Sequence, residues 1–205
     1  MPRTLLEIAG APRQPASLAT ATLVLIDHQC AYLDGEIRLD GIDGAVDALG
    51  RLLSVARAAG TPVIHVAHVA PAGAALFAAD GAGVGFIPAL VPGDGEAVVN
   101  KTLPNAFAGT DLADRLRRIG RKDLIVAGFA THMCISATVR AALDHGLRTT
   151  VVAAATATRD LPDPLGGVVS AATVQRAALA ALADRFAVVV PDTAAITCPP
   201  GYDFP

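Results

Sequence analysis

Short apolar runs rich in β-branched residues alternate along the chain with stretches whose apolar residues recur at helical spacing. The runs are too brief for helices, so we expect each of them to form a buried strand. They lie at residues 22–27, 62–69, 98–101, 124–127, 149–152 and 187–190. Helical spacing is found at residues 46–56, 111–119, 132–146 and 170–185. This alternation predicts an α/β fold: a three-layer α/β/α sandwich with a six-stranded, mostly parallel sheet and helices on both faces.

The stretch 123–146 changes from strand to helix around a cysteine. A short apolar run ends at Gly128, after which apolar residues recur three and four positions apart. We expect Thr131 to cap the helix and Gly146 to end it. Cys134 therefore falls in the first helical turn.

A thiol in a first helical turn has a physical reason to be reactive. Free N–H groups and the helix dipole favour the thiolate, so we expect the pKa of Cys134 to lie below the ~8.5 of an unperturbed thiol. The same N–H groups could hold an oxyanion. The alternative is packing, because an isolated cysteine among apolar residues is usually buried and inert.

Two charged residues end other predicted strands. Asp27 follows the first run, and in an open parallel sheet ligands bind outside the carboxyl ends of the strands. Lys101 ends the run at 98–101, and it is one of two lysines in a chain that otherwise uses arginine. Its ammonium could pair with Asp27 and with a thiolate. A strand-terminating aspartate and a surface lysine are the alternatives.

Together these residues resemble a known family. Asp27 after Leu-Val-Leu-Ile, Lys101 after Val-Val-Asn, and Gly-Phe-Ala-Thr-His-Met-Cys ending at Cys134 resemble the isochorismatase-like cysteine hydrolases, which include nicotinamidases and several small-amide and ureide hydrolases. The resemblance extends over about residues 22–192. It implies that Asp27, Lys101 and Cys134 form a catalytic triad.

The resemblance also implies details of the turn before the thiol. The peptide bond between Phe129 and Ala130 is expected to be cis, and the N–H groups of Ala130 and Cys134 are expected to form an oxyanion hole. Many relatives have an aspartate where this chain has Ala154. Its absence is expected to alter the loop that Arg159 follows.

Two histidines raise the question of a metal. Some relatives bind one through an Asp-x-His-x-x-His arrangement, and this chain has His65 and His68 with Val63 in the aspartate position. Residues three apart on a strand point to opposite faces, so the two histidines cannot easily share an ion. We therefore expect no metal and no other cofactor, a structural role for His65, and a place at the pocket edge for His68.

The segment 70–96 is rich in glycine, alanine and proline and shows little periodicity. Loops of this length are usually functional or flexible, and the resemblance favours a lid over the substrate. Phe77 and Phe86 could line a pocket or an oligomer contact. The expected substrate pocket consists of Gln29, Tyr32, His68, Phe107, Phe129 and Thr131.

Composition limits the remaining possibilities. The 205 residues suit a single domain, 1–205, and 53% hydrophobic content with 17% charged residues indicates a homo-oligomer, a dimer or tetramer. A net charge of -3 makes nucleic acid an unexpected partner, and no apolar run is long enough to span a membrane. Three cysteines without metal or disulfide spacing favour the cytoplasm. Cys30 and Cys198 are given no catalytic role.

These features predict an enzyme acting on a small molecule. The expected reaction is hydrolysis of a small amide, ureide or related C–N bond through a thioester on Cys134. Two alternatives are an isochorismate-type vinyl-ether hydrolase, which needs no thioester, and a non-catalytic binding or scaffold protein with the same fold. A dinucleotide-binding module is disfavoured, because Asp27 stands where a glycine-rich turn would follow the first strand.

Overall fold

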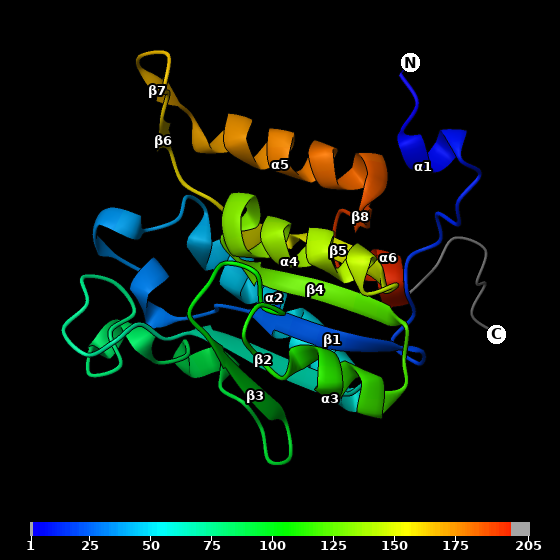
Figure 1. Ribbon diagram of the computed structural model, residues 1–205, viewed down its shortest axis with the longest axis horizontal. Coiled ribbons are helices and arrows are strands. Elements are labelled where there is room, and N and C mark those ends of the chain that lie inside the picture. Colours follow the sequence, from blue (N-terminus) through cyan, green and yellow to red (C-terminus); the bar gives the residue numbers. More distant parts are fainter. Residues whose placement is uncertain (1, 198–205) are drawn as a thin grey trace.

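A parallel sheet forms the centre of the protein, whose computed structural model describes residues 2–197. All neighbouring strands of this six-stranded sheet run parallel, in the order β3-β2-β1-β4-β5-β8 (Figure 1). The strands are β1 (Ala21–Ile26), β2 (Val63–His68), β3 (Ala97–Lys101), β4 (Asp123–Phe129), β5 (Arg148–Ala157) and β8 (Val188–Val190). The predicted α/β fold and its six strands are confirmed.

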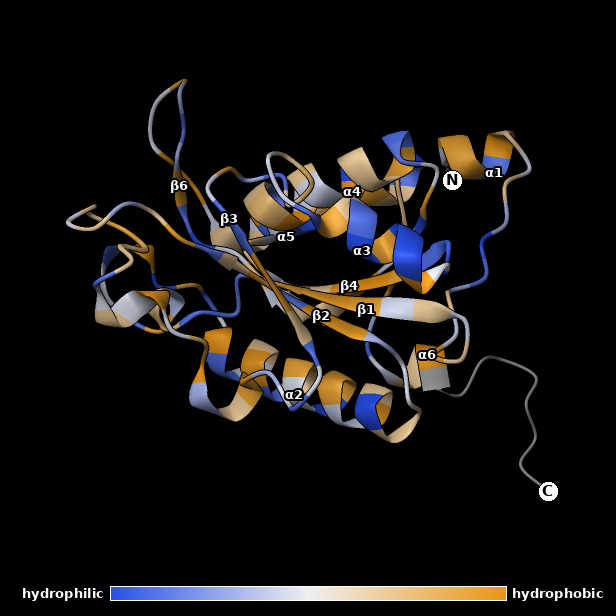
Figure 2. Ribbon diagram, turned by 60° about the horizontal axis from the view of Figure 1, so that its bottom comes forward, coloured by the Kyte–Doolittle hydropathy of each residue, from blue (hydrophilic) through white to orange (hydrophobic). Residues whose placement is uncertain are grey.

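Helices cover both faces of the sheet and make three layers (Figure 2). One face is covered by α2 (Ile42–Ala58), and the other by α3 (Leu112–Ile119), α4 (Ser136–Asp144) and α5 (Ala171–Arg185). The short helices are α1 (Leu5–Ile8) and α6 (Ala194–Thr197). The remaining elements are η1 (Cys30–Tyr32), η2 (Gly35–Ile37), η3 (Ala82–Val84), η4 (Pro88–Leu90), the π-helical turn η5 (Thr131–Ile135) and the small antiparallel pair β6 (Leu161–Pro162) and β7 (Val168–Val169).

Two hydrophobic cores lie on the two faces of the sheet. In β1, Leu23 and Leu25 point into the core beneath α2, whereas Val24 and Ile26 point into the core beneath α3, α4 and α5. All four are at most 1% exposed. Burial on both faces explains why the central strands are continuous apolar runs instead of alternating ones.

Several local predictions were wrong. Thr131 does not cap a helix, because its hydroxyl donates to Ala157 O and η5 begins without a side-chain cap. β5 continues to Ala157, well beyond the predicted end at residue 152.

Gly128 is required where β4 passes β1. Its φ is +116°, and a Cβ at this position would lie 2.0 Å from Ile26 O. The pairing register between β4 and β5 also shifts between Val126 and Gly128. Ile26 immediately precedes Asp27, so the close approach of two strands brings their ends to one edge of the sheet.

Within residues 2–197, no helix is long and apolar enough to cross a membrane. Cys198 lies outside the described residues.

Candidate active site

Three side chains meet at the carboxyl edge of the sheet. Asp27 follows β1, Lys101 ends β3, and Cys134 lies in η5 after β4. Lys101 Nζ lies 2.7 Å from Asp27 Oδ2 and donates a 3.3 Å hydrogen bond to Cys134 Sγ. Their exposed fractions are 0%, 1% and 3% for Asp27, Lys101 and Cys134. The structure thus brings together the three residues that the sequence singled out.

The end of β1 is held by its own backbone and by Gln29. Asp27 has a φ of +49°, a left-handed conformation that aspartate tolerates better than most residues, and its N–H donates to Val66 O. Gln29 Nε2 donates to His68 O and Val84 O at 2.9 and 2.7 Å, while its Oε1 accepts from His68 N at 2.8 Å. The Gln29 amide is fully engaged, which makes it a brace between β1, β2 and the 70–96 segment.

Burial changes the proton affinities of this cluster. Loss of solvent raises the pKa of Asp27, an effect opposed by the nearby Lys101 ammonium. Burial and then the Asp27 carboxylate raise the pKa of Cys134 to about 12. The expectation of a lowered thiol pKa was therefore wrong, because desolvation of the thiolate outweighs the stabilising effect of the helix N-terminus. The resting thiol keeps its proton, and a neighbouring base must remove it.

The turn before Cys134 is tightly wound. The peptide bond between Phe129 and Ala130 is cis, as the sequence resemblance implied. Ala130 O accepts hydrogen bonds from Met133 N and Ile135 N, so the turn closes around Ala130. Cys134 is consequently fixed between these two residues at the start of η5.

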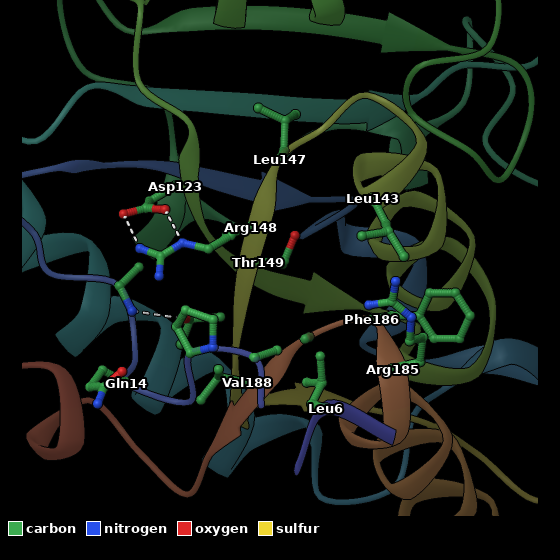
Figure 3. Close-up of a pocket in the computed structure, with 15 residues that line it drawn as sticks. Leu6, Gln14, Asp123, Leu143, Leu147, Arg148, Thr149, Arg185, Phe186 and Val188 are labelled. Carbon is green, nitrogen blue, oxygen red and sulfur yellow. Dashed lines mark hydrogen bonds and ion pairs between the residues drawn. The ribbon is translucent and has the colours of Figure 1, made fainter. Parts of the chain in front are cut away.

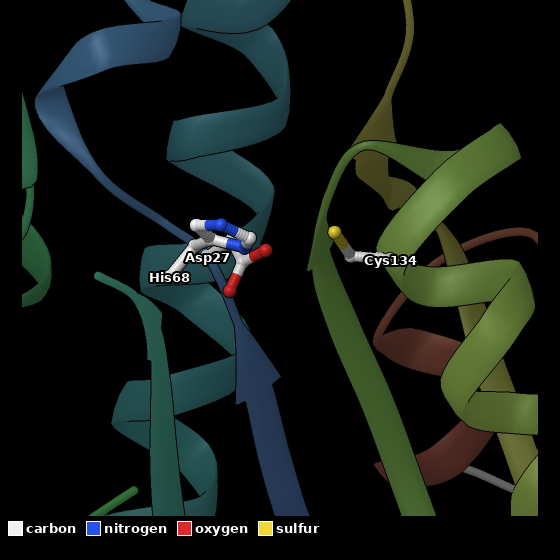
Figure 4. A group of neighbouring side chains, drawn as sticks. All are labelled: Asp27, His68 and Cys134. Atoms are coloured by element: carbon white, nitrogen blue, oxygen red, sulfur yellow. The ribbon is translucent and has the colours of Figure 1, made fainter. Parts of the chain in front are cut away.

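His68 contacts the same cluster from the end of β2. Lys101 Nζ and His68 Nδ1 are 3.1 Å apart, and Figure 4 shows Asp27 and His68 on one side with Cys134 facing them. One ligand atom from each of Asp27, His68 and Cys134 lies within 4.8 Å of the others, a spacing that could hold a metal ion. However, the Lys101 ammonium contacts all three groups, so a positive charge already lies among these atoms. The donor set therefore fits an ion poorly.

Aromatic side chains border the cluster. Tyr32 packs edge-on against Phe129 and Phe77, with ring centroids 6.0 and 5.3 Å apart. Phe77, from the 70–96 segment, also contacts the His68 ring at 5.2 Å. Burial, followed by the charges of Asp27 and the Cys134 thiolate, raises the pKa of Tyr32. These contacts place Tyr32, Phe129 and the 70–96 segment beside the cluster.

Phe107 lies in the hydrophobic core that also contains Cys134. Its ring stacks on His145, just beyond the end of α4, at a centroid distance of 4.4 Å. Two residues that the sequence did not single out for the pocket, His132 and Arg159, interact electrostatically beside Tyr32. The pKa of His132 is lowered by burial and then by the positive charge of Arg159, and that charge also acts on Tyr32.

His65 and His68 point to opposite faces of β2, as predicted. His65 Nδ1 lies 3.0 Å from His28 Nε2, and His65 Nε2 lies 2.7 Å from Glu96 Oε2. Glu96 also forms two hydrogen bonds with Arg57, both of 2.8 Å. His28 stacks on Phe86. No sequence pattern indicated this row of contacting side chains, because its members are far apart in the chain.

Two other positions lie apart from the cluster. Ala154 N donates to Pro191 O, and Ala154 lines a surface hollow with Asp40 and Gln175. Cys30 is half-buried and its Sγ donates to Phe86 O.

The fold and this cluster define an α/β sandwich protein with a buried thiol, carboxylate and ammonium at the carboxyl edge of its sheet. The isochorismatase domain family matches residues 21–195. The chain therefore belongs to the isochorismatase family, and it is a hydrolase.

Known relatives extend this likeness over most of the chain. A crystal structure of an isochorismatase from Pseudomonas putida superimposes with a TM-score of 0.90, at 44% identity, and covers 93% of this chain and 97% of that one. A secreted isochorismatase effector of Verticillium dahliae is 36% identical over 88% of this chain and 93% of its own length. Streptothricin hydrolase of Streptomyces noursei is 36% identical over 91% of this chain and 74% of its own length. Maleamate amidohydrolase of Pseudomonas putida is 32% identical over 70% of this chain and 72% of its own length.

Proposed function

We propose that the protein hydrolyses a small amide, ureide or related C–N bond through a thioester on Cys134, with Asp27, Lys101 and Cys134 as its catalytic triad. The observation that carries the proposal is the buried Lys101 ammonium in contact with both the Asp27 carboxylate and the Cys134 thiol. Relatives named streptothricin hydrolase and maleamate amidohydrolase support hydrolytic chemistry of this kind.

In the first half of the reaction, the Asp27 carboxylate takes the proton from Cys134 Sγ. Burial raises the pKa of the Asp27 carboxyl group and makes its carboxylate a stronger base, which offsets part of the rise in the pKa of the buried thiol. The sulfur then forms a bond to the substrate carbonyl carbon. The carbonyl oxygen becomes an oxyanion that accepts hydrogen bonds from the N–H groups of Ala130 and Cys134.

The intermediate then collapses, and the C–N bond breaks. Asp27 returns its proton to the leaving nitrogen, which departs as ammonia or an amine and leaves a thioester on Cys134. In the second half, Asp27 takes a proton from water, and the resulting hydroxide attacks the thioester carbon. The C–S bond breaks, the sulfur regains the proton from Asp27, and the acid product is released.

Lys101 remains protonated throughout this cycle. Its ammonium stabilises the Asp27 carboxylate at rest and the sulfur anion as it forms. His68 and Tyr32 are proposed to border the substrate, and the 70–96 segment, through Phe77, is proposed to cover it. Vinyl-ether hydrolysis is a weaker candidate, because it would leave the positioned thiol without a task.

The decisive experiment is a screen of small amides, ureides and carbamates for ammonia release by the purified protein. Cys134→Ala should reduce turnover at least ~10³-fold, as expected for loss of a nucleophile, whereas Cys30→Ala serves as the matched thiol control and should retain it. Quenching the reaction should leave an acyl group on the peptide that contains Cys134. Equal turnover by wild type and Cys134→Ala would refute the mechanism.

Assembly and location are further proposals. We propose a homo-oligomer, supported by apolar side chains exposed near the candidate site, with Met133 41% and Leu103 53% exposed. Light scattering after gel filtration should give a mass of at least two chains. The cytoplasm is proposed because Cys30 and Cys134 are unpaired thiols, and cell fractionation tests it.

A further inference from the structure

A cavity lies at the opposite edge of the sheet from the candidate active site. It has a volume of about 160 Å³ and lies at the amino ends of β4 and β5, where Asp123 and Arg148 begin these strands. It is bordered by the segment around α1, the end of α4, the end of α5 and the beginning of β8, and it is open to solvent on one side (Figure 3). The cavity shares no residue with the Asp27, Lys101 and Cys134 cluster.

The walls of this cavity are mostly apolar. They come from elements far apart in the sequence: Leu6, Leu143, Leu147, Phe186 and Val188. An engineered apolar cavity of roughly 150 Å³ is large enough to bind benzene. The space therefore suits one small ring or a short branched aliphatic group.

One buried hydroxyl in the cavity has no partner. Thr149 is 5% exposed, and its Oγ1 makes no hydrogen bond within the described part of the chain. The neighbouring Thr150, which also lines the cavity, is satisfied because its Oγ1 accepts from Ala16 N at 2.8 Å. A buried polar group without a partner is costly. Thr149 lines the cavity although Oγ1 itself is covered, so rotation about its Cα–Cβ bond is needed for a guest to form a hydrogen bond with it.

The charge of the lining favours an anion. Arg148 is neutralised by two hydrogen bonds to the Asp123 carboxylate, of 2.8 and 2.7 Å. Arg185 is exposed at the cavity and has no ion pair among residues 2–197. The two arginines and one aspartate leave one net positive charge beside an otherwise apolar space.

We infer that this cavity is a binding site for a small amphipathic carboxylate, with an apolar body about the size of one ring. The ring packs against Leu143, Phe186 and the other apolar walls. Rotation about its Cα–Cβ bond turns the Thr149 hydroxyl to donate to a carboxylate oxygen, and the charge of Arg185 attracts the anion. This inference does not rest on the proposed function, because it uses none of the same residues.

Fluorine NMR with 4-fluorobenzoate as the probe tests the site in the full chain. Wild type should show saturable binding, and Thr149→Val should weaken it about fivefold, the effect of losing one hydrogen bond. Arg185→Gln should weaken it about threefold, since an exposed charge contributes less. Fluorobenzene, which lacks the carboxylate, should bind less tightly than 4-fluorobenzoate.

Thr22→Val is the matched control. Thr22 is also buried, at 0% exposed, with an unpartnered Oγ1, but it does not line the cavity. Its substitution should leave 4-fluorobenzoate binding unchanged, and both valine variants should fold because each removes only an unsatisfied hydroxyl. The inference is overturned by absence of saturable binding to wild type, by equal effects of Thr149→Val and Thr22→Val, or by a crystal soaked with the probe that holds only water in the cavity.

Discussion

Two carboxylates, Glu96 just before β3 and Asp27 just after β1, each contact a cation, yet their pKa values shift in opposite directions. Glu96 accepts hydrogen bonds from Arg57 and from Gly93 N, which lower its pKa to about 2 despite partial burial. Asp27 has one cationic neighbour, Lys101, and burial raises its pKa. A carboxylate held by donors at the surface stays in its ionised form, whereas one fully deprived of water can exchange a proton even with an ammonium beside it. The first arrangement suits structure and the second suits catalysis.

The largest effect on hydrolysis is expected when Asp27 can no longer exchange a proton. Asp27→Asn keeps the shape of the side chain but cannot take a proton, so we expect hydrolysis to fall at least ~10³-fold. Steady-state ammonia release measures the effect. Asp123→Asn, at the far end of β4, is the matched control and should retain activity. Comparable rates for the two variants would show that Asp27 is not the base.

The position of Asp27 also depends on the close approach of β4 and β1. Gly128→Ala would place a Cβ 2.0 Å from Ile26 O, and we expect it to lower the free energy of unfolding by about 3 kcal/mol or more. Gly146→Ala is the control, because Gly146 has a φ of +72° but no neighbour within 4 Å. It should cost about 1 kcal/mol. Urea unfolding measures both, and equal losses would contradict the steric explanation.

The buried thiol makes stability depend on alkaline pH. Because the pKa of Cys134 rises from 9.0 to about 12 on folding, the neutral thiol contributes stability that is fully present below pH 9 and lost between pH 9 and 12. The free energy of unfolding should fall in this window by up to roughly 1.4 kcal/mol per pH unit from this group. Tyr32 titrates in the same direction, so the test is the difference from Cys134→Ala. An identical slope for that variant would disprove the shift.

Substitution of Glu96 should change the free energy of unfolding much more than the rate of hydrolysis. Glu96→Gln removes a charge from the contacts with Arg57 and His65, and we expect a loss of roughly 1–2 kcal/mol, because Arg57 is partly exposed. Ammonia release at saturating substrate should stay within about twofold. Asp114→Asn, in an exposed ion pair with Arg117, should change stability little.

The effect of Glu96→Gln on stability should depend on pH. The lowered pKa of Glu96 gives stability that is present above pH 4.5 and lost as the pH falls towards about 2. The stability difference between wild type and Glu96→Gln should therefore shrink across this range. A constant difference down to pH 2 would contradict it.

The sequence predicted what depends on local pattern. Apolar runs located six strands, and a carboxylate, a lysine and a thiol at strand ends indicated the cluster, since parallel strands share one carboxyl edge. Prediction from the sequence failed where a property depends on residues far apart in the chain. The pKa of Cys134 depends on burial under several elements, and Thr131 turns to a carbonyl on β5 instead of to its own helix. The His65 to Glu96 contact is likewise invisible without the fold.

The burial of Cys134 should make its thiol resistant to oxidation. Peroxides and alkylating agents react with accessible thiolates. The Cys134 thiol is 3% exposed and has a pKa of about 12, so almost no accessible thiolate is present at neutral pH. Cys30, which is half-buried, is the more open target of the two. The proposed nucleophile is thus protected at rest by its burial and by its proton.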